Sequence, residues 1–154
     1  MSAVASPLPP NASPSDSEVA GIPNLVRHES VIFEQASTIA TGVMKKRHYF
    51  RRPGRIVGIT SFRRTAASGM GAADSTDVDV NLNGSTILSA TIQHENASGN
   101  NDKLVAVLKS NHAASDAYGI QVVVGDYLEV EVDAIEAGAT GASGLFLDID
   151  VLVG

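Results

Sequence analysis

From Ser30 to Gly154, apolar and polar residues alternate with a period of two, which places every second side chain on one face of a β-strand. The clearest runs are Thr76–Leu82, Tyr127–Asp133 and Leu145–Val153. No segment in this region keeps the 3.6-residue period of an amphipathic helix. The pattern predicts an all-β protein of eight or nine strands, arranged as a jelly-roll-like antiparallel β-sandwich.

Turn signals separate these runs. Asn83–Gly84 stands between two alternating segments, and Asn-Gly suits the type I′ turn, which needs positive φ at both central residues. Pro53–Gly54 and Gly125–Asp126 indicate further turns. The remaining predicted strands are Ser30–Ala36, Val43–Phe50, Arg55–Arg64, Ser85–Ile92, Leu104–Leu108 and Ile120–Val124. In Arg55–Arg64, alternation predicts Ile56 and Phe62 on one face and Ile59 and Arg63 on the other.

Residues 1–26 differ in composition from the rest of the chain. Because proline fixes φ and lacks a backbone N–H, we expect an extended N-terminal arm outside a sandwich domain of residues 27–154. Such an arm is either a free tail or is ordered against a neighbouring subunit, whose contact would offset the entropy lost on ordering. The arm prolines predicted at this interface are Pro7, Pro9, Pro10, Pro14 and Pro23.

The net charge of −6 hides a polarised distribution. Eight of the 11 basic residues lie in a segment without Asp or Glu: Lys45, Lys46, Arg47, Arg51, Arg52, Arg55, Arg63 and Arg64. Neighbouring cations repel one another unless a partner supplies negative charge. We therefore expect the six arginines of this block to contact another subunit or a larger assembly. The alternative is that they only shield a sheet edge. The acidic overall balance speaks against a nucleic-acid partner.

Composition excludes several classes of protein. A chain of 154 residues predicts one domain, and the absence of cysteine excludes disulfides and thiolate metal sites. No apolar stretch approaches the roughly 20 residues of a membrane-spanning helix. We expect no membrane segment and no secretion signal.

The residues that could carry chemistry are scattered. His28, His48, His94 and His112 show no metal-ligand spacing, and neither a nucleophile elbow nor a phosphate loop is present. We predict no enzyme, no catalytic residue, no cofactor and no metal. An enzyme would need His94 or His112 beside a serine and a carboxylate in a cleft. The acidic rows at 77–81 and 129–133 are interpreted as a solvated sheet face, with calcium binding as the alternative.

Three motifs in order carry a family resemblance: Phe50-x-x-Pro53-Gly54-x-Ile56, DVDVNLNGSTIL at 77–88 and VGDYLEVEVD at 124–133. They resemble a β-sandwich module of tailed-bacteriophage virion proteins. In that group a G-x-I strand precedes a V-D-V-N-x-N-G-x-x-I hairpin and a late G-D-x-L-x-V-x-V-D hairpin. The resemblance covers about residues 43–153 and leaves the arm outside it.

The resemblance implies a non-enzymatic structural protein of the virion, often trimeric. Because the chain has no repeated shaft, a capsid decoration (cement) protein is favoured, located on the capsid surface. Its expected partners are further copies of itself, as a homotrimer, and the major capsid protein or other virion proteins. The alternative is a tail, baseplate or head-fibre module that binds a host receptor or glycan through the loops Ala66–Ser75 and Glu95–Lys103. The lack of tryptophan speaks against the glycan.

Overall fold

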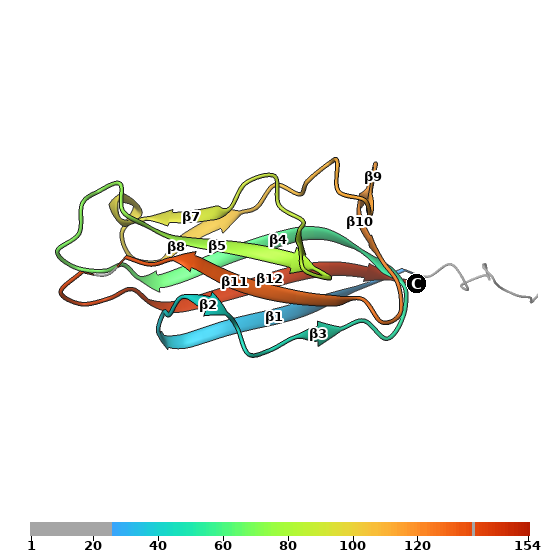
Figure 1. Cartoon of the computed structure of the whole chain (residues 1–154), viewed down its shortest axis with the longest axis horizontal. Helices are drawn as coiled ribbons and strands as arrows, with labels where there is room; N and C mark the ends of the chain where they lie inside the picture. The colour runs from blue at the N-terminus through green and yellow to red at the C-terminus, as the bar shows by residue number, and fades with distance from the viewer. Residues whose placement is uncertain (1–25, 137) are drawn as a thin grey trace, which may run out of the picture.

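A computed structural model describes residues 26–136 and 138–154, which form two antiparallel sheets packed as a β-sandwich (Figure 1). The predicted all-β sandwich is confirmed, whereas its finer classification as a jelly roll stays a prediction. The five arm prolines lie outside the described residues. In this part of the chain, none of the helical segments has the length and apolarity needed to cross a membrane.

Within residues 26–136 and 138–154, each sheet contains six strands, several of them only two residues long. The first sheet consists of β1 (Arg27–Thr38), β12 (Ser143–Val153), β4 (Gly54–Thr65), β10 (Gly119–Val122) and β9 (Ser115–Asp116) in that order, with β8 (Asp102–Val105) also paired to β4. The second consists of β2 (Gly42–Val43), β11 (Tyr127–Ala134), β5 (Ser75–Leu82) and β6 (Ser85–Thr86), with β3 (His48–Tyr49) paired to β11 and β7 (Ile92–Glu95) to β5. The short 3-10 helix η2 (Asn96–Ser98) follows β7.

The core lies between the sheets and is built from alternate residues of the long strands. β5 and β11 bury Val78, Val80, Leu82, Leu128, Val130 and Val132, and β12 buries Leu145, Leu147, Ile149, Val151 and Val153. These inward faces are the ones that the alternation predicts. Burying one such side chain contributes roughly 1.5–3 kcal/mol, so the three strands supply much of the driving force for folding.

A β-bulge in β4 changes the predicted faces of that strand. Asp150 lies opposite Gly58 while Val151 lies opposite Ile56, so Val57 is an extra residue in the pairing. Beyond the bulge the inward positions shift by one residue, and Ile59, Ser61 and Arg63 are buried together with Ile56. The prediction of one continuous face through Ile56 and Phe62 was therefore wrong.

The Asn83–Gly84 hairpin is confirmed. The φ angles are 51° at Asn83 and 85° at Gly84, and Leu82 pairs with Ser85 across the turn. The strand after this turn ends at Thr86, earlier than predicted, and the next regular strand to pair with β5 is β7. The predicted strand Val43–Phe50 is likewise divided into β2 and β3.

Candidate functional site

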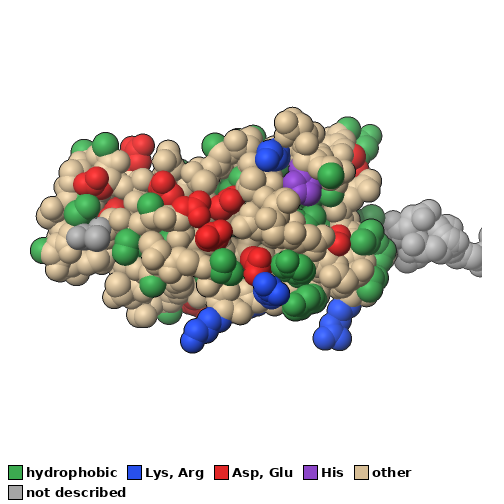
Figure 2. Space-filling view, viewed as in Figure 1, with side chains coloured by type: hydrophobic (Ala, Val, Ile, Leu, Met, Phe, Trp, Pro, Cys, Tyr) green, Lys and Arg blue, Asp and Glu red, His purple; other side chains and the backbone are tan. Residues whose placement is uncertain are grey.

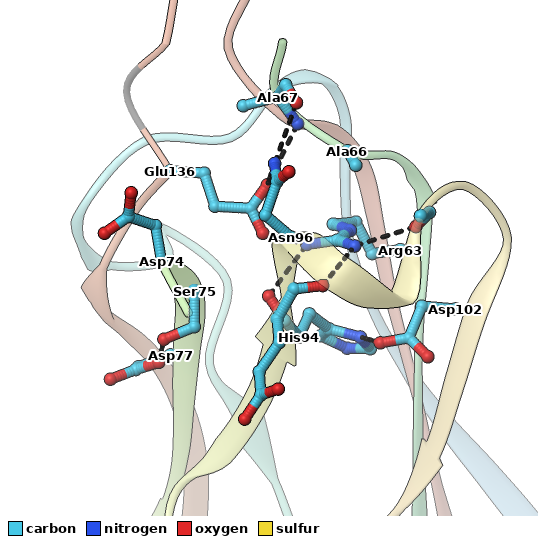
Figure 3. Close-up of polar contacts among 12 residues, drawn as sticks. Arg63, Ala66, Ala67, Asp74, Ser75, Asp77, His94, Asn96, Asp102 and Glu136 are labelled. Atoms are coloured by element: carbon cyan, nitrogen blue, oxygen red, sulfur yellow. Dashed lines mark hydrogen bonds and ion pairs between the residues drawn. The ribbon is translucent and has the colours of Figure 1, made fainter. Parts of the chain in front are cut away.

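A row of three polar side chains connects the two sheets near one end of the sandwich. Ser61 Oγ in β4 lies 2.8 Å from His94 Nε2 in β7. His94 Nδ1 in turn lies 2.8 Å from Asp102 Oδ2 in β8 (Figure 3). With a neutral ring, Nδ1–H donates to Asp102 and Nε2 accepts from the serine hydroxyl. These are the contacts of a serine–histidine–aspartate triad, and they form the grouping around His94 that an enzyme would require.

The row lies in the interior rather than in a cleft. Ser61 and His94 have no solvent exposure. Burial lowers the pKa of His94 below its ordinary value of 6.5, and the Asp102 hydrogen bond opposes this effect. A neutral histidine between a hydroxyl and a carboxylate joins the buried Ser61 and His94 to the partly buried Asp102 and fixes β7 against β4 and β8.

Arg63 lies beside this row and is also fully buried. Its guanidinium forms an ion pair with Glu136 and donates to the carbonyls of His94 and Gly99, both at 2.8 Å, and of Glu95 at 3.1 Å (Figure 3). The prediction that Arg63 lies at an intersubunit surface was therefore wrong, because a side chain without solvent exposure contacts no partner. The β4 bulge, which turns position 63 inward, is the physical reason.

Glu136 extends the network to the neighbouring loops. Its Oε1 accepts from the backbone N–H of Ala67 at 2.9 Å and from Asn96 Nδ2 at 3.2 Å. The two long loops are also joined directly, because Asn96 N donates to the Asp74 carbonyl at 2.7 Å. Ala66–Ser75 and Glu95–Lys103 thus lie together at one end of the sandwich, opposite the C-terminus (Figure 1), and are anchored by buried charges.

Four of the predicted interface arginines lie at the other end, where β1 and β4 begin and β12 ends. Exposed apolar side chains accompany them there, with exposed fractions of 52% for Tyr49, 58% for Val123 and 76% for Tyr118. We call this surface the arginine end: Arg47, Arg51, Arg52, Arg55, Val26, Tyr49, Tyr118, Val123 and Val124. Apolar side chains gather at this end of the molecule in Figure 2.

The arginines differ in how far the chain itself neutralises them. Arg47 pairs with Glu129 at 2.6 Å and lies 4.6 Å from the ring centroid of Tyr127. Arg55 pairs with Asp116 at 2.5 Å, and hydrogen bonds from Arg55, from the Tyr118 backbone and from Gln121 lower the pKa of Asp116 to about 2.

Arg51 and Arg52 keep the most free charge. Arg52 reaches Glu29 only at 3.6 Å, and Arg51 has no ion pair among the described residues. Both line a surface hollow of about 400 Å³ next to Val153.

The basic block is therefore not one surface. Arg64 is exposed at the loop end of the sandwich, while Lys45 and Lys46 lie beside β1 and the other exposed arginines lie at the arginine end. In the linear sequence these cations lie within 20 residues of one another. The long strand β4 separates Arg55 from Arg64 by nine residues, about 30 Å of extended chain.

The acidic rows face away from the core on neighbouring strands of the second sheet, and acidic side chains gather on this face in Figure 2. Glu131 lies opposite Asp79. Burial, then the charges of Asp79 and Asp77, raise the pKa of Asp133. Within the described ranges, no group of three or more His, Asp or Glu side chains is placed to hold a metal ion.

Comparisons with family models, with curated proteins and with solved structures returned no match to this chain.

Proposed function

We propose that this chain is a structural protein of a tailed-bacteriophage virion, a capsid decoration protein that attaches to the shell by its arginine end. The three ordered motifs, one strand and two hairpins, support the virion class, as a resemblance. The observation that carries the proposal is the composition of the arginine end, where arginines lie at the same end of the sandwich as exposed valines and tyrosines. Arginine and aromatic residues are enriched in protein interfaces, and an apolar patch with a polar rim indicates a contact surface.

The covalent path of the chain points to the same end. The described sandwich begins at Val26, which lines a hollow together with Pro53, Arg55 and Val153. Residues 1–25 therefore join the sandwich at the surface that carries the free arginines. A segment attached there adds contact area to the same interface without a separate binding event. Attachment would stabilise the shell by mass action, through buried area and salt-dependent ion pairs.

The buried row supports a non-enzymatic role. A catalytic serine must reach its substrate, and Ser61 has no exposed surface. The network around Arg63 and His94 instead holds the loop end together, which suits a scaffold that presents surfaces.

The test is co-sedimentation of the full chain with heads of its phage that lack this protein. We expect Arg51→Glu/Arg52→Glu to lose binding, whereas Arg64→Glu/Lys103→Glu, which changes the net charge equally at other sites, retains it. Removal of residues 1–26 should also abolish binding while the sandwich stays folded. Normal decoration by either the arginine variant or the truncated chain would refute the proposal.

A tail or fibre module that binds a glycan is the second candidate, and one observation favours it. Tyr118 is 76% exposed, and its ring centroid lies 5.7 Å from the Arg55 guanidinium, an arrangement on which a sugar ring can stack. Glycan-array binding by the wild-type chain that Tyr118→Ala removes would favour this function over decoration.

A further inference from the structure

The outer edge of β1 is open. β1 is 12 residues long, and within the described residues it pairs only with β12. The Ile32 carbonyl accepts from Lys46 Nζ, so the backbone of Ile32 points away from β12. Because alternate residues of an antiparallel strand direct both backbone groups to the same edge, Ser30 and Glu34 share this orientation. A long exposed edge of this kind is a template for one more strand.

A groove of about 680 Å³ runs beside this edge, between β1 and the segment that contains β2. Its volume falls within the range of clefts that hold bound ligands. Val43 is half exposed in this groove. Lys45 and Lys46 also line it, and neither forms an ion pair within the described ranges. The residues that shape it are Ile32, Glu34, Val43, Met44, Lys45 and Lys46. The groove thus offers strand-pairing groups, apolar side chains and excess positive charge together.

One segment outside the described residues matches all three properties. Residues 15–22, SDSEVAGI, form the longest proline-free stretch before Val26, so each residue retains its backbone N–H. The segment contains Asp16 and Glu18, the two acidic residues of positions 1–25. In an extended strand, residues two apart share a face, so both carboxylates can face Lys45 and Lys46. Ile22, on the same face as both carboxylates, supplies an apolar side chain.

The loops that would let residues 15–22 fold back onto β1 of their own chain are unfavourable. The segment that pairs with β1 is therefore expected to come from a second copy of the chain. A two-residue hairpin loop at 23–24 requires positive φ at Pro23, which its ring forbids. A three-residue loop requires the left-handed conformation at Leu25, where glycine is preferred. A four-residue loop over 22–25 places Glu18 directly opposite Glu29, and like charges at opposed positions are destabilising.

We propose that residues 15–22 of one copy add a strand to the β1 edge of a second copy and place Asp16 and Glu18 against Lys45 and Lys46. The contact is heterologous, since it joins two different surfaces. Repeated from copy to copy, such a contact forms a closed ring, for example a trimer, where the rotation between copies closes, and an open filament where it does not. The inference goes beyond attachment to a shell, because it concerns assembly of the free protein.

Reciprocal charge reversal tests this contact in the full-length protein, with the mass measured by light scattering after size exclusion. The wild-type chain should be an oligomer. Asp16→Lys/Glu18→Lys and Lys45→Glu/Lys46→Glu should each yield monomers. An equimolar mixture of the two variants should associate again, since each then offers the other an opposite charge. Arg64→Glu/Lys103→Glu, reversed elsewhere, should keep the wild-type mass.

Three results would overturn the inference: a monomeric wild-type chain, a wild-type mass for either reversed variant, or a mixture that stays monomeric. Association in the mixture would also exclude pairing of residues 15–22 with β1 of the same chain, because mixing two variants cannot restore a contact within one chain. If Lys45→Glu/Lys46→Glu does not fold, the mass of Asp16→Lys/Glu18→Lys decides alone, because these two substitutions lie outside the sandwich. Capsid binding plays no part in this measurement, so this contact and the proposed function can fail separately.

Discussion

Arg63 and Glu136 form an ion pair in which neither side chain has any solvent exposure. Taking two charges out of water carries a desolvation penalty of several kcal/mol per ion, which requires complete hydrogen bonding as compensation. Here the two terminal nitrogens of the guanidinium also donate to three main-chain carbonyls, and the carboxylate also accepts from Ala67 and Asn96. The buried Nε of Arg63 has no hydrogen-bond partner among the described residues, so the compensation is incomplete at that one atom. The pair therefore organises the loop end of the sandwich.

We predict that removing one member of this pair destabilises the fold strongly. Glu136→Gln leaves the Arg63 charge buried without a counter-ion and should lower the free energy of unfolding by about 3–5 kcal/mol. Urea titration followed by circular dichroism measures the change. The exposed pair Arg27–Glu29 provides a control, because Glu29→Gln should change stability little. Equal effects of the two substitutions would contradict the assigned role of the buried pair.

The sequence could predict strands better than it could predict this network. In β11 and β12 the alternation continues without interruption, so the inward residues follow from the pattern alone. In β4 one extra residue at Val57 reverses the faces, and the adjacent Gly58 is the one local signal of a bulge, because an isolated glycine within a strand pattern often marks one. Arg63 was therefore predicted at the surface, where an arginine is usually found.

The contacts of His94 could not be predicted for a different reason. Ser61, His94 and Asp102 lie on three strands from both sheets, and their meeting depends on which strands pair and in which register. Sequence spacing contains no information on such pairings. The arginine end could not be predicted for the same reason. Tyr118 and Val123 come from the chain around β10, and they lie near Arg55 only because β10 pairs with β4.

We predict that His94 makes the protein less stable in mild acid. Burial lowers the pKa of His94 in the folded state, so the unfolded chain binds the proton more tightly. The free energy of unfolding should therefore fall as the pH drops below 6.5, by at most about 1.4 kcal/mol per pH unit for this one proton. Comparison of wild type with His94→Gln by urea titration isolates this contribution. A wild-type stability that rises over that range relative to the variant would show that the sign is wrong.

We predict that Ser61 does not react as a nucleophile in the folded protein. An alkyl fluorophosphonate labels exposed, activated serines, and Ser61 has no exposed surface. Intact-mass measurement should show no adduct on the native chain. Ser61→Ala should instead reduce stability by about 1–3 kcal/mol, because His94 Nε2 loses its buried partner. An adduct that Ser61→Ala removes would support an enzymatic function.

The Asn83–Gly84 turn yields a prediction that separates backbone strain from steric contact. A Cβ at Gly84 would meet no atom within 4 Å, yet its φ of +85° is one that side-chain-bearing residues rarely adopt. Gly84→Ala should therefore destabilise the fold by roughly 1–2 kcal/mol through backbone conformation alone. Gly58→Ala is the matched control, since its Cβ would meet only Asp150 Cβ at 4.0 Å and no positive φ is required. Its stability should stay equal or rise by about 0.4–1 kcal/mol, because alanine narrows the unfolded ensemble. If urea titration gives the two variants the same stability, the strand pairing of β5 with β6 does not depend on this turn conformation.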